Sequence, residues 1–198
     1  MKTLTQISQQ DNFNDDYKTQ LCNRLQNAFA EEINAWYGYI IISKSLLGTN
    51  RKDLENFFIE TAKDEYEDHA MWILERLSQL KQAPTLVLSP DMLNIAKHKY
   101  IVPDQISQHG YISTLRAIEI NIENEKGAIE TYKELEQFTR NIDVVTNDKI
   151  KHILADEEEH LSELQDFYDD LSKIPDNSRD EYSDFKTTIN ISDILTEL

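Results

Sequence analysis

The chain has 198 residues, which is enough for one domain with a substantial core, and it carries 37 acidic against 20 basic side chains, for a formal net charge of −17. This charge argues against a nucleic-acid-binding protein, which needs clustered Lys and Arg, and favours a cationic partner such as a metal ion. Few glycines and prolines, four of each, predict long helices, and the single cysteine, Cys22, excludes an intrachain disulfide framework.

The polar N-terminal lead, residues 1–14, lacks the apolar core of a signal peptide. The longest apolar run, residues 39–42, is too short to span a bilayer. We therefore expect a cytoplasmic protein that has no membrane partner.

Apolar residues recur at helical spacing from residue 21 onwards and predict a first helix that stops at Gly48, a natural helix terminator. A second helix is predicted from about residue 50 to the segment before Pro84, because proline cannot continue a helix. Residues 83–110 hold three of the four prolines, so we interpret them as a crossover, with a possible short helix at 91–98.

The same periodicity predicts a third helix over about 111–140 and a fourth over about 144–171. The C-terminal tail, residues 174–198, is polar until an isoleucine-rich stretch that could form one short helix. Residues 15–173 are therefore predicted to be an all-α four-helix bundle, made of two antiparallel helical hairpins joined by the long crossover.

The two halves of the predicted bundle repeat one another. The first and third helices both contain E-x-x-A-x-x-x-Y, which places Glu32 and Tyr39 on one helical face and Glu125 and Tyr132 on another. The second and fourth helices each carry a glutamate followed closely by a histidine. These two pairs are Glu65 with His69, and Glu157 with His160.

Glutamate and histidine at these separations share a helical face and can reach one metal ion. Carboxylate and imidazole together suit iron or manganese, and a two-iron site in a bundle uses a glutamate from two helices and Glu-x-x-His from the other two. The six predicted ligands are Glu32, Glu65, His69, Glu125, Glu157 and His160. A metal-free scaffold is the alternative, but buried carboxylates without a cation cost several kcal/mol unless they are protonated.

With these motifs and the segment Ile153–His160, the chain resembles the ferritin-like superfamily, in particular bacterioferritins and Dps-like proteins, over roughly residues 20–170. The resemblance implies that Glu32 and Glu125 each bind one metal ion, and that Glu65 and Glu157 bridge the two ions. The histidines would complete the two coordination shells. Tyr39 and Tyr132 could donate hydrogen bonds to the ligands from outside these shells, or supply electrons for oxygen reduction. Tyr66 follows Glu65 where bacterioferritins have their haem-binding methionine, so haem is not expected.

The second helix departs from the family pattern, because Glu65 and His69 are four residues apart where the family has three. A π-turn could absorb the extra residue, or ordinary i, i+4 geometry could suffice. A third alternative is that Asp68 replaces His69 as the ligand. We favour Glu65 with His69.

The function predicted from these residues is binding of two iron ions per subunit and oxidation of Fe(II) by oxygen or peroxide, with iron storage or detoxification in a homo-oligomer. Manganese is the alternative metal. A diiron oxidase, oxygenase or peroxidase that acts on a small substrate as a small oligomer would carry the same ligands, and it would need an open apolar channel to the metals.

Overall fold

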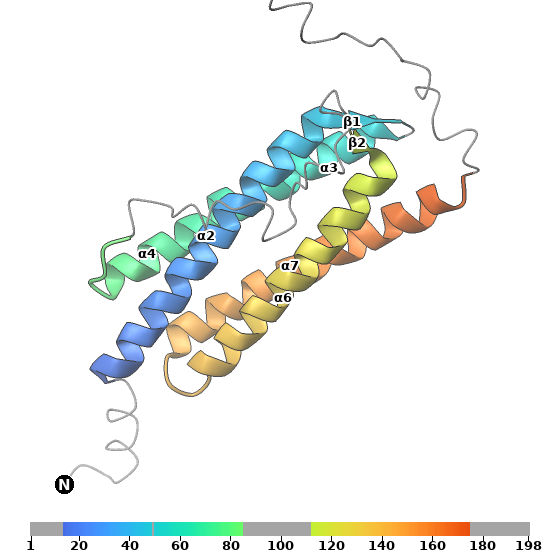
Figure 1. Ribbon diagram of the computed structural model, residues 1–198. Helices are drawn as coiled ribbons and strands as arrows, with labels where there is room; N and C mark the ends of the chain where they lie inside the picture. The colour runs from blue at the N-terminus through green and yellow to red at the C-terminus, as the bar shows by residue number, and fades with distance from the viewer. Residues whose placement is uncertain (1–13, 49, 85–111, 175–198) are drawn as a thin grey trace, which may run out of the picture.

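A computed structural model describes residues 14–48, 50–84 and 112–174 of the chain. Within these ranges the protein is all-α apart from two very short strands (Figure 1). The elements are α2 (Asp15–Ser45), β1 (Leu46–Leu47), α3 (Arg51–Lys63), the π-helix η1 (Asp64–Ala70), α4 (Met71–Gln79), β2 (Ile112–Ser113), α6 (Thr114–Thr139) and α7 (Val144–Ser172). The short helices predicted at 91–98 and in the tail lie outside the described residues.

The elements form two antiparallel hairpins that pack side by side (Figure 1). One hairpin pairs α2 with the continuous helix built from α3, η1 and α4, and the other pairs α6 with α7. The second helix ends at the opposite end of the bundle from the start of α6, as a crossover connectivity requires. The predicted all-α four-helix bundle of two hairpins is therefore confirmed.

Local sequence sets the helix ends. The side chain of Asn14 accepts a hydrogen bond from the backbone N–H of Tyr17 and caps α2, and Asp143 caps α7 in the same way through Thr146. Gly48 has a φ of 112°, which side chains rarely permit, and the chain turns there after α2.

The two residues that follow α2 and the two that precede α6 form a parallel strand pair, in which Leu46 lies opposite Ile112 and Leu47 opposite Ser113. This pair places the start of α6 beside the end of α2. None of the helices in the described part of the chain is both long and apolar enough to cross a membrane.

The core consists of two apolar clusters, one towards each end of the bundle. On every helix the change from one cluster to the other falls at the predicted metal ligands. On α2, for example, Ala28 belongs to one cluster and Ala35 to the other, and Glu32 lies between them. A buried polar layer thus divides the core at mid-height.

Candidate metal centre

The six predicted ligands converge in this polar layer. Four of them are glutamates no more than 3% exposed, and the two histidines are 0% and 6% exposed. Donor atoms of the six fall into two groups in which all atoms lie within 4.8 Å of one another. The first group is Glu32, Glu65, His69 and Glu157, and the second is Glu65, Glu125, Glu157 and His160.

Because Glu65 and Glu157 belong to both groups, the two groups adjoin and share two carboxylates. Such an arrangement suits two cations bridged by carboxylates. Asp68, the alternative ligand, lies outside both groups, and its side chain is 55% exposed.

The π-helix η1 explains how Glu65 and His69 reach the centre together. Their spacing of four continues to Ile73 and Leu77, and an unbroken α-helix would rotate such a series by about 40° at each step. In η1 the backbone N–H of Met71 bonds to the carbonyl of Tyr66, five residues earlier, which widens the turn. The separation of four therefore spans less than one turn, as the separation of three between Glu157 and His160 does in α7.

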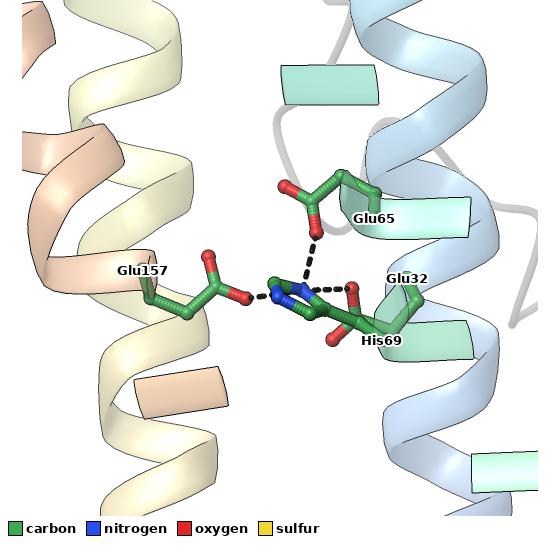
Figure 2. Close-up of side chains that lie close together, drawn as sticks. All are labelled: Glu32, Glu65, His69 and Glu157. Carbon is green, nitrogen blue, oxygen red and sulfur yellow. Dashed lines mark hydrogen bonds and ion pairs between the residues drawn. The ribbon is translucent and has the colours of Figure 1, made fainter. Parts of the chain in front are cut away.

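Figure 2 shows the first group, in which the His69 ring lies among three glutamates from three helices. Its Nδ1 is 3.1 Å from Glu65 Oε2, 3.3 Å from Glu157 Oε1 and 3.4 Å from Glu32 Oε2. The second group is looser: His160 Nδ1 lies 3.7 Å from Glu157 Oε2 and 3.8 Å from Glu65 Oε1.

Two tyrosines cross-link the repeat. Tyr39 donates a hydrogen bond to Glu125, and Tyr132 donates one to Glu32. Each tyrosine therefore orients the glutamate of the opposite hairpin rather than the one on its own helix. Burial and the nearby Glu32 carboxylate raise the pKa of Tyr132 well above its usual value, which keeps its hydroxyl a donor.

The buried carboxylates have strongly perturbed pKa values. Burial and the charge of Glu157 raise the pKa of Glu65 and that of Glu125 well above the ordinary range. Burial would also raise the pKa of Glu157, but its contacts with His160 and His69 lower it below the ordinary range. Without a cation, the layer therefore keeps protons on some glutamates while Glu157 stays ionised.

Both histidines hold their protons more tightly than usual. Burial lowers the pKa of His160, but its contacts with Asp64 and Glu157 raise it overall, to about 11. Burial likewise opposes protonation of His69, and its contacts with Asp156 and Glu157 raise the pKa of that ring far more. Without a cation, the protons on these rings therefore balance carboxylate charge that a bound cation would otherwise balance.

Three buried atoms of the centre make no hydrogen bond among the described residues: Glu157 Oε1, Glu157 Oε2 and His160 Nδ1. Glu157 Oε1 has only an ion-pair contact, with His69 Nδ1 at 3.3 Å. Buried polar atoms of native proteins are normally satisfied, so orphaned atoms call for an explanation. Bound cations would supply one, because the two carboxylate oxygens offer lone pairs, and Nδ1 offers one once its proton is displaced. The oxygen and nitrogen donors also fit iron or manganese, while Cys22 packs in the apolar cluster at one end of the bundle.

The model of the ferritin-like domain family matches residues 22–174 of this chain. A bacterioferritin-related protein from Bacteroides fragilis, described as a dodecameric thioferritin, is 32% identical, with 78% of this chain and 88% of that chain covered and a TM-score of 0.70. The chain belongs to the ferritin-like family. None of the curated proteins compared with it matches.

More distant ferritin-like structures share the fold. Dps from Thermosynechococcus elongatus is 19% identical, with 82% of this chain and 96% of that chain covered and a TM-score of 0.67. A Rhodobacter capsulatus bacterioferritin is 17% identical, with 81% and 90% covered and a TM-score of 0.61.

Two aspartates that were not predicted as site residues also contact the candidate centre. His69 Nε2 lies 3.4 Å from Asp156 Oδ2, and His160 Nε2 lies 3.6 Å from Asp64 Oδ2. Each aspartate directly precedes a predicted glutamate ligand on its own helix and contacts the histidine of the other helix. The Asp-Glu pair that occurs in both helices is the sequence signal that could have identified these aspartates. A carboxylate on the outer nitrogen of a ligand histidine fixes the orientation of its ring.

A pocket of about 360 Å³ opens beside the centre, between α3–η1 and α7. It is lined by Phe57, Glu60, Thr61, Asp64, Asp68, Asp156, Glu159, His160 and Glu163. Six of these nine residues are carboxylates. The pocket therefore reaches the candidate centre at His160 through an acidic surface.

Proposed function

We propose that this protein binds two Fe(II) ions as substrate at the two adjoining groups and oxidises them with oxygen or peroxide, retaining the ferric product in a homo-oligomer. The observation that carries the proposal is the pair of four-donor groups that share Glu65 and Glu157 and contain orphaned donor atoms. Membership of the ferritin-like family supports the same reading.

The position of each residue in the two groups indicates its proposed role in binding the ions. Glu65 and Glu157 lie in both groups and would bridge the two ions, while Glu32 and Glu125 would each bind one ion. The histidines supply neutral nitrogen donors that tune affinity, and the carboxylates favour the ferric product. Two Fe(II) ions release one electron each, so together they reduce one peroxide to water or one oxygen to peroxide.

The pocket beside the centre favours a cation over an organic substrate. Its wall is mostly carboxylate, which attracts cations and offers little apolar surface to a neutral molecule. The proposal of storage in a hollow oligomer is supported by the B. fragilis relative, which is described as dodecameric.

The test is to add Fe(II) to the purified apoprotein without oxygen, measure the ions bound per subunit, and then admit air or peroxide while recording the Fe(III) absorbance. We expect two ions per subunit and rapid oxidation. Glu157→Gln, which alters a ligand shared by both groups, should abolish rapid oxidation. Glu158→Gln is the matched control, because Glu158 is the next residue but is exposed and pairs with Lys133.

Wild-type protein that binds no Fe(II), or a Glu157→Gln variant that oxidises iron like wild type, would overturn the proposal. Size-exclusion chromatography tests the storage part separately. A monomer or dimer that retains no mineral would leave the oxidation chemistry intact and contradict storage.

A further inference from the structure

A third group of possible ligands lies just outside the centre. Donor atoms of Asp68, His69 and Asp156 lie within 4.8 Å of one another. Asp68 and Asp156 also line the acidic pocket, whereas His69 is fully buried behind them. The group therefore stands between the pocket and the first ligand group of the centre.

The group already attracts a cationic side chain. Lys149 on α7 places its Nζ 2.7 Å from Asp68 Oδ1, across the boundary between η1 and α7. Its side chain is 22% exposed, so the ammonium is partly withdrawn from water. An incoming divalent cation would have to compete with this tethered ammonium for Asp68.

His69 faces both sites, one with each ring nitrogen. Its Nδ1 points to Glu32, Glu65 and Glu157, and its Nε2 lies 3.4 Å from Asp156 Oδ2. A neutral imidazole has one acceptor nitrogen and one N–H, so it can bind an ion on one side at a time. The ring therefore binds an ion through Nε2 or through Nδ1, but not through both at once, and the two binding modes can only follow one another.

We propose that Asp68, His69 and Asp156 form a loading site at which a divalent cation from the acidic pocket is first held, before His69 hands it to the centre. This proposal rests on the proposed function, because it concerns how the same centre is filled. At the loading site Nε2 would bind the ion and the ring proton would be on Nδ1. On transfer the Nδ1 proton would pass through Glu65 Oε2, 3.1 Å away, to solvent, and Nδ1 would bind the ion. Nε2 would take up one proton from water in the acidic pocket and donate it to Asp156, so one proton leaves, one enters, and the ring is neutral in both states.

The π-helix gives the site its geometry. Asp68 directly precedes His69 in η1, and the Glu65-to-His69 spacing of four leaves this aspartate on the pocket side while the histidine remains in the centre. Lys149 holds Asp68 until a divalent cation, with twice the charge, displaces it. The site thus favours divalent over monovalent cations.

The test follows the rate at which Co(II), which is redox-stable and coloured when bound, enters the full-length apoprotein in a stopped-flow spectrometer. Asp68→Asn should slow loading about tenfold, within the range that local charge can alter association rates. Glu67→Gln is the matched control, because it removes the same charge from the neighbouring exposed position. It should change the rate less than twofold.

Lys149→Met should accelerate loading, since it removes the competing ammonium. Lys126→Met is the control and should not accelerate it, because Lys126 pairs with Glu123 and neither residue lines the pocket. At equilibrium all four variants should still hold two Co(II) ions per subunit. In crystals of Glu32→Gln soaked in Co(II), an anomalous peak should lie between Asp68 and Asp156.

Equal loading rates for Asp68→Asn and Glu67→Gln, with two ions bound in each, would overturn the loading site alone. The absence of an anomalous peak between Asp68 and Asp156 in the soaked Glu32→Gln crystals would do the same. Wild-type protein that binds no Co(II) would overturn both the loading site and the proposed function.

Discussion

The hydroxyl of Tyr132 on α6 donates a hydrogen bond to Glu32 on α2, one hundred positions earlier in the sequence. Tyr39 on α2 returns the same contact to Glu125 on α6. The two hairpins are therefore linked through the candidate ligands themselves, and each hairpin fixes the orientation of a carboxylate that the other supplies.

Removing one of these donors should weaken metal binding. Tyr132→Phe leaves Glu32 without its donor, and loss of such a supporting contact typically lowers metal affinity by about tenfold or more. A Co(II) titration of the apoprotein measures the effect. Tyr37→Phe is the control, because Tyr37 is 45% exposed. Equal affinities in the two variants would contradict an orienting role for Tyr132.

The two aspartates behind the histidines should contribute unequally. Asp156 lies within hydrogen-bonding distance of His69, whereas Asp64 is 3.6 Å from His160 and its side chain is 60% exposed. Asp156→Asn should therefore lower Co(II) affinity by roughly tenfold, and Asp64→Asn by clearly less. Isothermal titration calorimetry measures the Co(II) affinity of both variants. A larger loss of affinity in Asp64→Asn than in Asp156→Asn would contradict the prediction.

Metal binding should release protons and strengthen as the pH rises. Burial raises the pKa values of Glu65 and Glu125, and the pKa of His160 is raised to about 11, so these groups carry protons near neutrality. A metal binds only the deprotonated forms, so each ion must displace protons. Calorimetry in buffers of different ionisation enthalpy counts the protons released, and a pH-independent affinity would contradict the prediction.

Asp143 should stabilise the fold away from the centre. It caps α7 through Thr146 and binds Arg76 Nη2 at 2.7 Å, so Asp143→Ala should cost about 2 kcal/mol in unfolding free energy. Burial would raise its pKa, but Thr146 and Arg76 lower it overall. Its contribution is therefore present above the unfolded pKa of about 4 and is lost as the pH falls through the lower folded value.

Chemical denaturation at neutral and acidic pH tests this role of Asp143. Asp148→Ala is the matched control, since it removes an exposed carboxylate from the same end of α7. The stability difference between the two variants should shrink in acid. A difference that is unchanged by pH would exclude the ion pair as its source.

Deleting Glu67 should convert η1 into ordinary α-helix. The deletion leaves three residues' separation between Glu65 and the histidine, so the wide turn is no longer needed to bring them together. We expect two Co(II) ions per subunit to be retained and thermal stability to be maintained or improved. Loss of one ion from this variant would show that the centre requires the π-helix itself.

Much of this architecture could be predicted because its signals are local. Helical periodicity, Gly48 and Pro84 predicted the hairpins, and the repeated Glu and His spacings identified the residues that the structure brings together. The strand pair of Leu46–Leu47 with Ile112–Ser113 could not be predicted, because two residues are too few to show an alternating pattern.

The remaining features depend on partners that are distant in sequence. Spacing alone left three ways to accommodate the extra residue before His69, and the choice depends on how Ile73 and Leu77 pack against the other helices. The contact between Lys149 and Asp68 joins residues 81 positions apart, and no local pattern predicts it.

The polar layer that divides the core has a mechanical consequence. Apolar packing secures the two ends of the bundle, while the middle turns are held by groups whose charges balance only when cations or protons are present. Bound iron would then hold the helices together at the middle of the bundle. Backbone amides near Glu65 and Glu157 should exchange with solvent more slowly in loaded subunits than in empty ones, so their exchange rates would report how much iron a subunit carries.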